Sequence, residues 1–233
     1  MQRRADFGRI RLALARSAHF KQLNAVALDR LAGLGRLRHA RNGERLPADN
    51  QRLWIVVDGA VRLTARLAHR QKVHAVLGRG SYFGLAAALG EGAFPLDVHA
   101  AGPTDVAVID GARLRGILQA HPSLWRYVAA LAYGRLRLAL GVMEDNRLRP
   151  LVERVIRRLL GHASSYAIVE GEQPELRMTQ ADLAGMVDAG RSRINVALGQ
   201  LAADGLIRAG YRTITLLDLP RLRSLAGGEV EAF

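Results

Sequence analysis

Residues 178–201 read MTQADLAGMVDAGRSRINVALGQL, a pattern typical of two short helices joined by a tight turn. Thr179 is a good N-cap, and Asp182 three residues later completes an acidic form of the capping box. Asp188-Ala189-Gly190 supplies the turn, in which Gly190 would tolerate a positive φ. The side chains expected to be buried are Leu183, Met186 and Val187 in the first helix, then Ile194, Ala197, Leu198 and Leu201 in the second.

The second helix would leave basic and amide side chains exposed at its N-terminal end. In the DNA major groove, Arg pairs with guanine O6 and N7 and Asn pairs with adenine. After this helix, residues 204–208, 209–212 and 213–217 are predicted to form a strand, a turn and a strand, which is a wing that places Arg212 near a phosphate backbone. The DNA contacts expected are Thr179 and Gln180, which would hold phosphate at the start of the first helix, and Arg191, Ser192, Arg193, Asn195, Val196 and Arg212.

A plain helical hairpin with solvated arginines is the structural alternative. The surrounding sequence disfavours it, because another amphipathic helix is predicted over 151–160 and a wing follows.

The region from Arg36 to Ile109 has a different pattern of apolar and turn-forming residues. Short apolar or alternating runs, such as 53–57 and 61–65, are separated by Gly, Asp or Pro. Several strands at such spacing indicate an antiparallel barrel or sandwich. Before this region, residues 17–34 are predicted to form a helix.

A long helix is predicted to follow Pro122. Leu124, Val128, Leu131, Leu138 and Val142 form one apolar face, and Leu136, Leu140 and Met143 widen it. A helix with such a broad apolar arc has more than one surface to cover, so one face is expected on the barrel and the other on a second copy. An ordinary core helix is the alternative. Pro150 is expected to end the helix at a hinge over 145–150.

Composition limits the remaining possibilities. The chain has 233 residues, a formal net charge of +13 and no cysteine, so disulfides, thiol nucleophiles and cysteine-bound metal clusters are excluded. The basic excess suggests an anionic partner, although the segment after Asn146 is nearly neutral. The apolar runs are too short to span a bilayer and no signal peptide is evident, so a cytoplasmic protein without a membrane partner is expected. The histidines show no metal-binding spacing, and no cofactor is expected.

In the order of these parts, the chain resembles the Crp/Fnr family of bacterial transcription regulators from about Phe20 to Leu225. The resemblance rests on Gly43, residues 53–61 and 77–84, His121-Pro122 and residues 179–207. It implies an α+β fold with an N-terminal antiparallel β-barrel of the jelly-roll, cyclic-nucleotide-binding-like type, a long dimerisation helix and a C-terminal winged helix-turn-helix. The domains expected are 1–121 for effector sensing, 122–149 for dimerisation and the hinge, and 150–233 for DNA binding.

The resemblance also implies an effector pocket, and here the sequence departs from the family. Leu85 stands where cyclic-AMP-binding members have a ribose-binding Glu, and Pro95 and Leu96 stand about where an Arg-Ser pair clamps the phosphate. A phosphate without its Arg would be desolvated and unpaired, so cyclic AMP is not expected to bind in the usual way. The residues expected around this pocket are Gly80, Phe83, Gly84, Leu85, Pro95, Leu96, Leu136, Ala139 and Leu140.

The second helix of the helix-turn-helix, which would read the DNA bases, also departs from the family pattern. Arg191 matches the family, whereas Ser192 and Val196 replace a Glu and an Arg, so a different target half-site is expected. The function expected is a dimeric, sequence-specific transcription regulator whose partners are a pseudo-palindromic DNA operator, a second copy, RNA polymerase and an unknown small-molecule effector. The alternatives are an effector-independent regulator with a purely structural barrel and a cyclic-nucleotide-binding module without DNA binding. The sequence offers no nucleophile–base pair, metal cluster or phosphate loop, so an enzyme is not expected.

Overall fold

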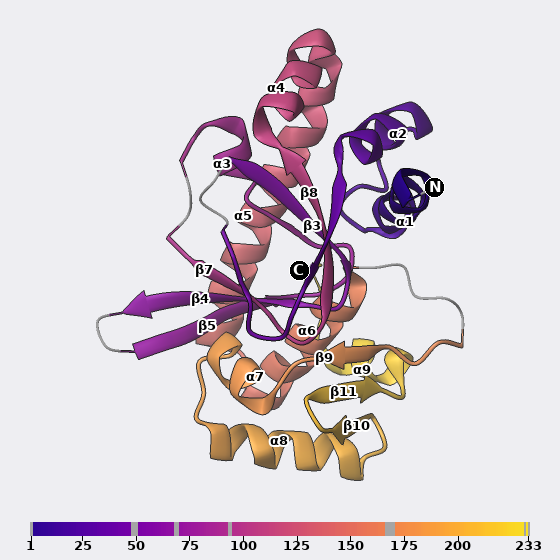
Figure 1. Cartoon of the computed structure of the whole chain (residues 1–233). Helices are drawn as coiled ribbons and strands as arrows, with labels where there is room; N and C mark the ends of the chain where they lie inside the picture. The colour runs from indigo at the N-terminus through magenta and orange to yellow at the C-terminus, as the bar shows by residue number, and fades with distance from the viewer. Residues whose placement is uncertain are drawn as a thin grey trace.

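The computed structural model describes residues 2–47, 51–67, 70–92, 95–165, 171–230 and 232. Two N-terminal helices precede a pair of sheets, a long helix runs along them, and a smaller helical domain with its own sheet follows (Figure 1). The α+β architecture expected from the sequence is confirmed. In the described ranges, every helix is too short or too polar to cross a lipid bilayer.

The N-terminal strands form two antiparallel sheets of four strands. One sheet has the order β1 (Arg36–Ala40), β8 (Thr104–Asp110), β3 (Arg52–Asp58) and β6 (Tyr82–Phe83). The other has the order β2 (Arg45–Leu46), β7 (Asp97–Ala100), β4 (Val61–Leu67) and β5 (Arg70–Leu77). Among the described strands, the two sheets therefore stay separate and do not close into one barrel.

The continuous apolar run in β3 is explained by burial on both faces. Trp54 and Val56 belong to the apolar cluster that contains residues of both sheets. Leu53, Ile55 and Val57 belong to a second cluster, which contains residues of the helices and is called here the outer cluster. Because successive side chains of a strand point to opposite faces, a strand covered on both sides needs apolar residues at every position.

The N-terminal helices differ from the prediction of one helix over 17–34, which was wrong. They are α1 (Gln2–Arg16) and α2 (Ala25–Leu34), and the chain between them turns. Asn24 starts α2 by accepting a hydrogen bond from the Ala27 N–H at 2.9 Å. Ile10 and Leu14 bury the inner face of α1, but many arginines lie among its apolar residues and hide the helical pattern.

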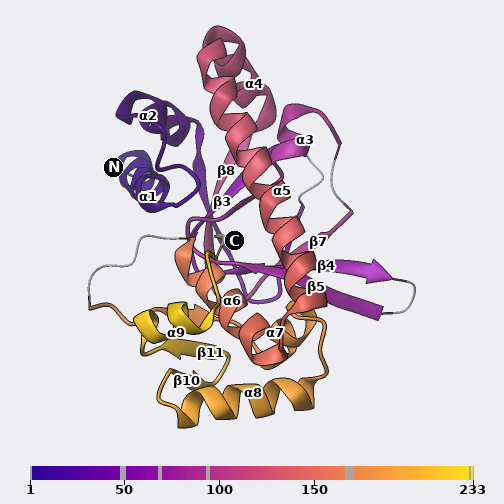
Figure 2. The same ribbon diagram turned by 180° about the vertical axis from the view of Figure 1, so that it is seen from behind.

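The long helix α5 (Trp125–Leu148) has the two faces that the sequence indicates. It follows α3 (Leu85–Leu89), α4 (Gly111–Ala120) and a 3-10 turn, η1 (Pro122–Leu124), and it runs along the sandwich from α4 to the level of α7 (Figure 2). Its inner face packs on the sandwich and the outer cluster through Val128, Leu131, Leu138 and Val142, and Leu124 of η1 joins them. Its outer face exposes Trp125, Tyr133, Leu136, Leu140 and Met143, each by 46 to 62%.

The helix α5 ends where Pro150 predicts. Its last residue is Leu148, and Arg149 has an extended backbone with φ −105° and ψ 146°. A residue that precedes proline is disfavoured in the helical region, which explains the break.

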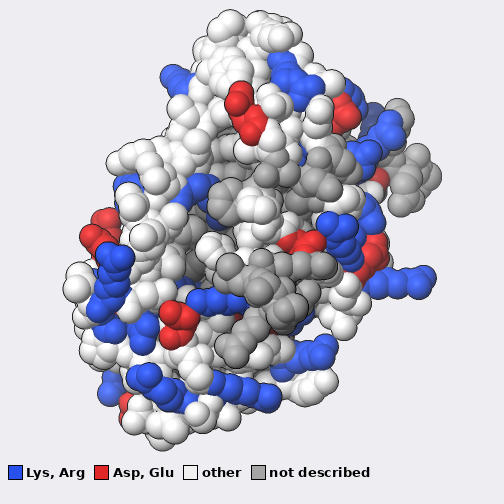
Figure 3. Space-filling view, turned by 90° about the vertical axis from the view of Figure 1, so that its left-hand side faces the viewer, with Lys and Arg blue, Asp and Glu red and all other residues white. Residues whose placement is uncertain are grey.

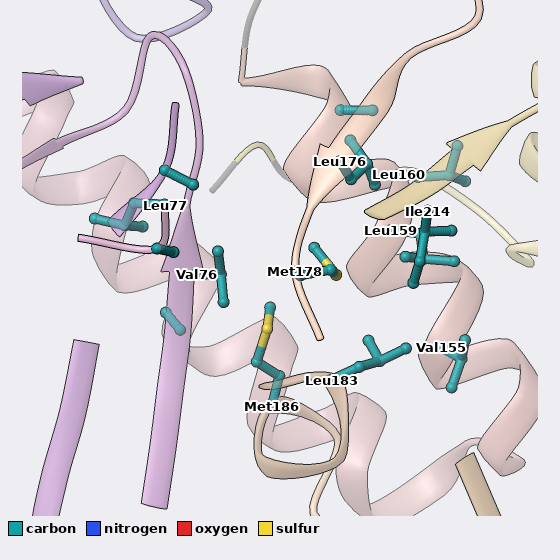
Figure 4. Close-up of a cluster of buried hydrophobic side chains, with 14 of the residues drawn as sticks. Val76, Leu77, Val155, Leu159, Leu160, Leu176, Met178, Leu183, Met186 and Ile214 are labelled. Carbon is teal, nitrogen blue, oxygen red and sulfur yellow. The ribbon is translucent and has the colours of Figure 1, made fainter. Parts of the chain in front are cut away.

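The helices and strands after residue 150 pack around one buried core. Its elements are α6 (Leu151–Ser164), β9 (Glu175–Arg177), α7 (Gln180–Met186), α8 (Arg191–Ala203), β10 (Ile207–Gly210), β11 (Thr213–Leu216) and α9 (Leu219–Leu225). Met178 and Met186 lie between Val76 of β5 and the side chains of Leu159 and Leu183 (Figure 4). The core of this part is therefore continuous with that of the sandwich.

Candidate nucleic-acid interface

The first helix of the predicted helix-turn-helix, α7, begins with the expected capping box. The Thr179 hydroxyl accepts a hydrogen bond from the Asp182 N–H at 3.1 Å, and the Asp182 carboxylate accepts one from the Thr179 N–H at 2.7 Å. Thr179 and Gln180 are half-buried at this end. The capping box fixes where the helix starts.

The turn after α7 connects it to α8. The positive φ lies at Asp188, with a value of 53°, whereas Gly190 is extended at φ −71°. Asp tolerates the left-handed region better than most residues, and the residue before α8 must be extended because it is the N-cap. The tolerance of Gly190 for a positive φ is therefore not used in this turn.

The second helix, α8, has the predicted division into two faces. Ile194, Ala197, Leu198 and Leu201 are buried to at most 2% exposure. The opposite side is open to solvent at Arg191, Ser192, Arg193, Asn195 and Val196. The helix forms one edge of the whole molecule, at the bottom in Figure 1.

Arg191 and Arg193 have no ion-pair partner in the part of the chain that the structure describes. Basic side chains gather at the lower end of the face that carries this helix start, with few acidic side chains among them (Figure 3). The guanidinium groups are therefore available to an anionic partner, next to the exposed N–H groups of the first helical turn.

The wing is present as β10 and β11. The strands include Ala209 and Gly210, which the sequence interpretation assigned to the turn, so the turn itself is Tyr211-Arg212. Arg212 has φ 58°, and its guanidinium carbon lies 5.5 Å from the centroid of the Tyr211 ring. Tyr211 is 88% exposed and was missed in the sequence interpretation, although an aromatic residue at a wing tip is a visible signal.

The helix-turn-helix is fastened to the hairpin β4–β5, which the sequence did not indicate. Arg62 pairs with Asp182 at 2.5 Å, and Lys72 pairs with Asp188 at 2.6 Å. Gly185 permits the approach, because a Cβ there would lie 2.7 Å from the Val73 carbonyl oxygen. The carboxylate that caps α7 thus also ties it to the sandwich.

A second ionic cluster joins α5 to α6 at the hinge. Asp145 is 5% exposed and lies 3.0 Å from Arg149, 2.9 Å from Arg157 and 3.1 Å from Arg158. Arg158 is also buried, which lowers its pKa, and the neighbouring Asp145 carboxylate acts to raise it. The predicted hinge is therefore held by a buried carboxylate shared among three arginines.

His162 of α6 packs against the sandwich in a neutral form. A Cβ at Gly78 would lie 2.4 Å from His162 Cε1, and His162 Nε2 has no hydrogen-bond partner. Burial lowers the pKa of His162 from 6.5 to about 4.

We expect His162→Gln to flatten the acid dependence of stability. Between pH 6.5 and about 4 the unfolded chain binds a proton that the folded chain excludes, so the free energy of unfolding falls as the pH falls through this window. The loss approaches about 1.4 kcal/mol per pH unit. Urea unfolding at pH 7, 6 and 5 measures it, and parallel curves for the two proteins would contradict the assignment to His162.

The residues expected around an effector pocket are not all brought together. Phe83 is buried and stacks on Trp54 with ring centroids 5.7 Å apart, inside the cluster between the sheets. Leu136, Ala139 and Leu140 lie on the outer face of α5. The other residues of the set are the buried Gly80, the half-buried Gly84, Leu85 and Leu96, and the exposed Pro95.

Searches among known proteins agree with this architecture. A family profile described as a cyclic nucleotide-binding domain matches residues 38–121, and one described as a Crp-like helix-turn-helix domain matches residues 153–225. The transcriptional regulator SdrP of Thermus thermophilus is 29% identical over 190 residues, which cover 78% of this chain and 87% of that protein. The cyclic AMP receptor protein of the same organism is 26% identical over 179 residues, which cover 76% and 81%.

Among solved structures, FixK2 from Bradyrhizobium japonicum matches with a TM-score of 0.71 and 25% identity, over 84% of this chain and 99% of that one. The two profiles match in the order in which the sandwich and the helix-turn-helix occur here, on either side of the long helix. The chain therefore belongs to the Crp/Fnr family of DNA-binding bacterial transcription regulators.

Proposed function

We propose that the chain is a homodimeric regulator that reads a specific, pseudo-palindromic DNA sequence with the N-terminal end of α8. The observation that carries this proposal is the exposed first turn of α8, where Arg191 and Arg193 lack ion-pair partners within the described residues and Asn195 shares their exposed side. Polar side chains that could pair with base edges are thus exposed on one face of a helix whose opposite face is buried in a core.

The neighbouring elements supply the contacts that position such a helix. The hydroxyl proton of Thr179 can be donated to a phosphate, because this hydroxyl accepts its bond from Asp182. Arg212 at the tip of the wing can reach the DNA backbone on the other side of α8. Phosphate contacts fix the register, while the base contacts of α8 select the sequence.

The outer face of α5 supports a homodimer. Ala129, Tyr133, Leu136, Leu140 and Met143 follow one another at spacings of four and three residues, and all are exposed. This set is called here the seam. Spacing of this kind is typical of a coiled-coil contact, in which each helix buries the same stripe of its partner. Two copies would present two α8 helices to half-sites about 34 Å apart.

The proposal divides the chain as the sequence suggests, with 1–121 as the sensing part, 122–149 as dimerisation helix and hinge, and 150–233 as the DNA-binding part. Such a regulator would act on cytoplasmic DNA together with RNA polymerase. We propose no usual cyclic AMP binding, because Leu85, Pro95 and Leu96 supply no charge for a phosphate. The stack of Trp54 on Phe83 favours a second candidate, a regulator whose sandwich takes no effector between its sheets.

Arg191→Ala tests the base-reading role. We expect it to lower affinity for an operator selected from random duplexes by about 5- to 150-fold, which corresponds to about 1–3 kcal/mol, and to relax one base position. Affinity for random duplex should change little. Fluorescence anisotropy with both duplexes measures the two affinities.

Arg223→Ala is the matched control, because Arg223 is an exposed arginine of the same domain on α9. It should leave the selected operator bound as tightly as before. Equal losses on the operator and on random duplex for Arg191→Ala would make Arg191 a backbone contact and would count against base reading.

A further inference from the structure

A cavity of about 430 Å³ lies outside the sandwich, between α2, α4, α5 and the segment 18–23 that joins the first two helices. Of the residues expected around the effector pocket, only Leu85 lines it. Small-molecule sites occupy about 300–1,000 Å³, so the cavity has the size of a ligand site.

Leucine is the most frequent residue in the wall of this cavity. Leu31 and Leu34 come from α2, Leu114 and Leu118 from α4, and Leu131 from α5. These residues belong to the outer cluster or pack against it, so the wall is held in place by a core. An apolar ligand body would gain about 25 cal/mol for each Å² removed from water there.

The charged side chains that line the cavity are all cationic. Lys21, Arg30 and Arg135 contribute to the lining, and no acidic residue does so within the described ranges. The Arg135 guanidinium already has partners within the protein. It donates a hydrogen bond to the Tyr82 carbonyl oxygen at 2.6 Å, and its central carbon lies 4.4 Å from the centroid of the Tyr82 ring. Lys21 and Arg30 are exposed and have no ion-pair partner in the described chain.

The cavity lies on the side of α5 that faces its own protomer. The α5 residues that line it include Val128, Leu131 and Arg135, whereas Tyr133 and Leu136 of the seam do not. A second copy packed on the seam would therefore leave the cavity within one protomer.

The cavity also touches the end of the DNA-binding part. Val230 and Ala232 contribute to its lining. Arg157 of α6 holds the preceding residues by donating to the carbonyl oxygens of Ala226 and Glu229, at 2.9 Å each. An occupant would contact the N-terminal segment, the long helix and this tail together.

From an apolar wall, two cations without an ion-pair partner and no acidic lining group, all within the described residues, we infer that this cavity binds an aliphatic carboxylate, with its chain among the leucines and its headgroup at Lys21 and Arg30. The inference concerns a site separate from α8 and does not depend on DNA binding.

Calorimetric titration of the full chain with decanoate, decan-1-ol and decyltrimethylammonium below their micelle concentrations tests the ligand chemistry. Decanoate should bind one molecule per protomer, at least about tenfold more tightly than the cationic probe, because a charge-assisted contact is worth about 1.5–3 kcal/mol. Lys21→Glu with Arg30→Glu should remove that preference. Absence of decanoate binding, or equal binding of decanoate and the cationic probe, would overturn the inference.

Gly134→Leu tests the location. Gly134 lines the cavity, and a Cβ there meets no atom within 4 Å, so a leucine would fill the space while favouring the helix. Gly141→Leu is the matched control, because Gly141 lies one heptad further along α5, also has open space at Cβ and does not line the cavity. Decanoate binding should be lost with Gly134→Leu and kept with Gly141→Leu. Binding that survives Gly134→Leu would place decanoate elsewhere and overturn the site.

Discussion

Replacing Leu136 and Leu140 together by glutamate is expected to convert the proposed dimer to a monomer and to lower operator affinity by about 100-fold or more. Both side chains are more than half exposed in the single chain and lie at the centre of the seam. Like charges at facing positions would oppose pairing, and each α8 would then bind its half-site alone. Linking two binding modules commonly contributes 10²–10⁴ in affinity, which sets the size of the loss.

The association state is measured by sedimentation velocity and the affinity by anisotropy on the selected operator. Leu148→Glu is the matched control, since Leu148 lies on the same helix, is 80% exposed and falls outside the seam. It should remain dimeric with unchanged affinity. A double variant that stays dimeric, or a control that dissociates to the same extent, would show that the seam does not hold the dimer.

Asp145→Ala is expected to lower the free energy of unfolding by about 3–5 kcal/mol, because it leaves Arg158 buried without its carboxylate. The other two partners, Arg149 and Arg157, would lose the same contact, so the break between α5 and α6 would loosen as well. Urea denaturation monitored by far-ultraviolet circular dichroism gives the change.

Asp29→Ala provides the comparison for this measurement. Asp29 also pairs with an arginine, Arg11, at 2.5 Å, but their side chains are 50% and 41% exposed. Exposed ion pairs contribute about 0–1 kcal/mol, so the loss there should be small. Equal losses from both substitutions would contradict a special role for the buried carboxylate at the hinge.

The parts of this fold that sequence could predict are those whose evidence is local. The capping box of Thr179 and Asp182 and the apolar spacing of α8 lie within a few residues of each other, and both are confirmed. The stop before Pro150 depends on one proline and is confirmed as well. Local sterics and helical periodicity decided these features before any tertiary contact was known.

The features that were missed depend on contacts between distant residues. Arg62 and Asp182 are 120 positions apart, and nothing in either neighbourhood indicates their pairing. The three arginines around Asp145 look like ordinary surface charges until α6 folds back on α5. Burial within the tertiary fold distinguishes them, and a single sequence does not contain it.

The residues predicted around the effector pocket also depend on tertiary packing that the sequence alone does not contain. Leu136 and Leu140 were placed by resemblance near a pocket, yet the structure turns them outward, because Leu138 and Val142 already fill the inner positions of α5.

If α8 presents Arg191 and its neighbours to DNA bases in two symmetric copies, the 233-residue chain should select a symmetric site from a pool of random duplexes. We expect enrichment of an inverted repeat whose half-site centres are about one helical turn, or 10–10.5 base pairs, apart. Recovery of duplexes with no shared sequence, or of a single unrepeated half-site, would contradict it.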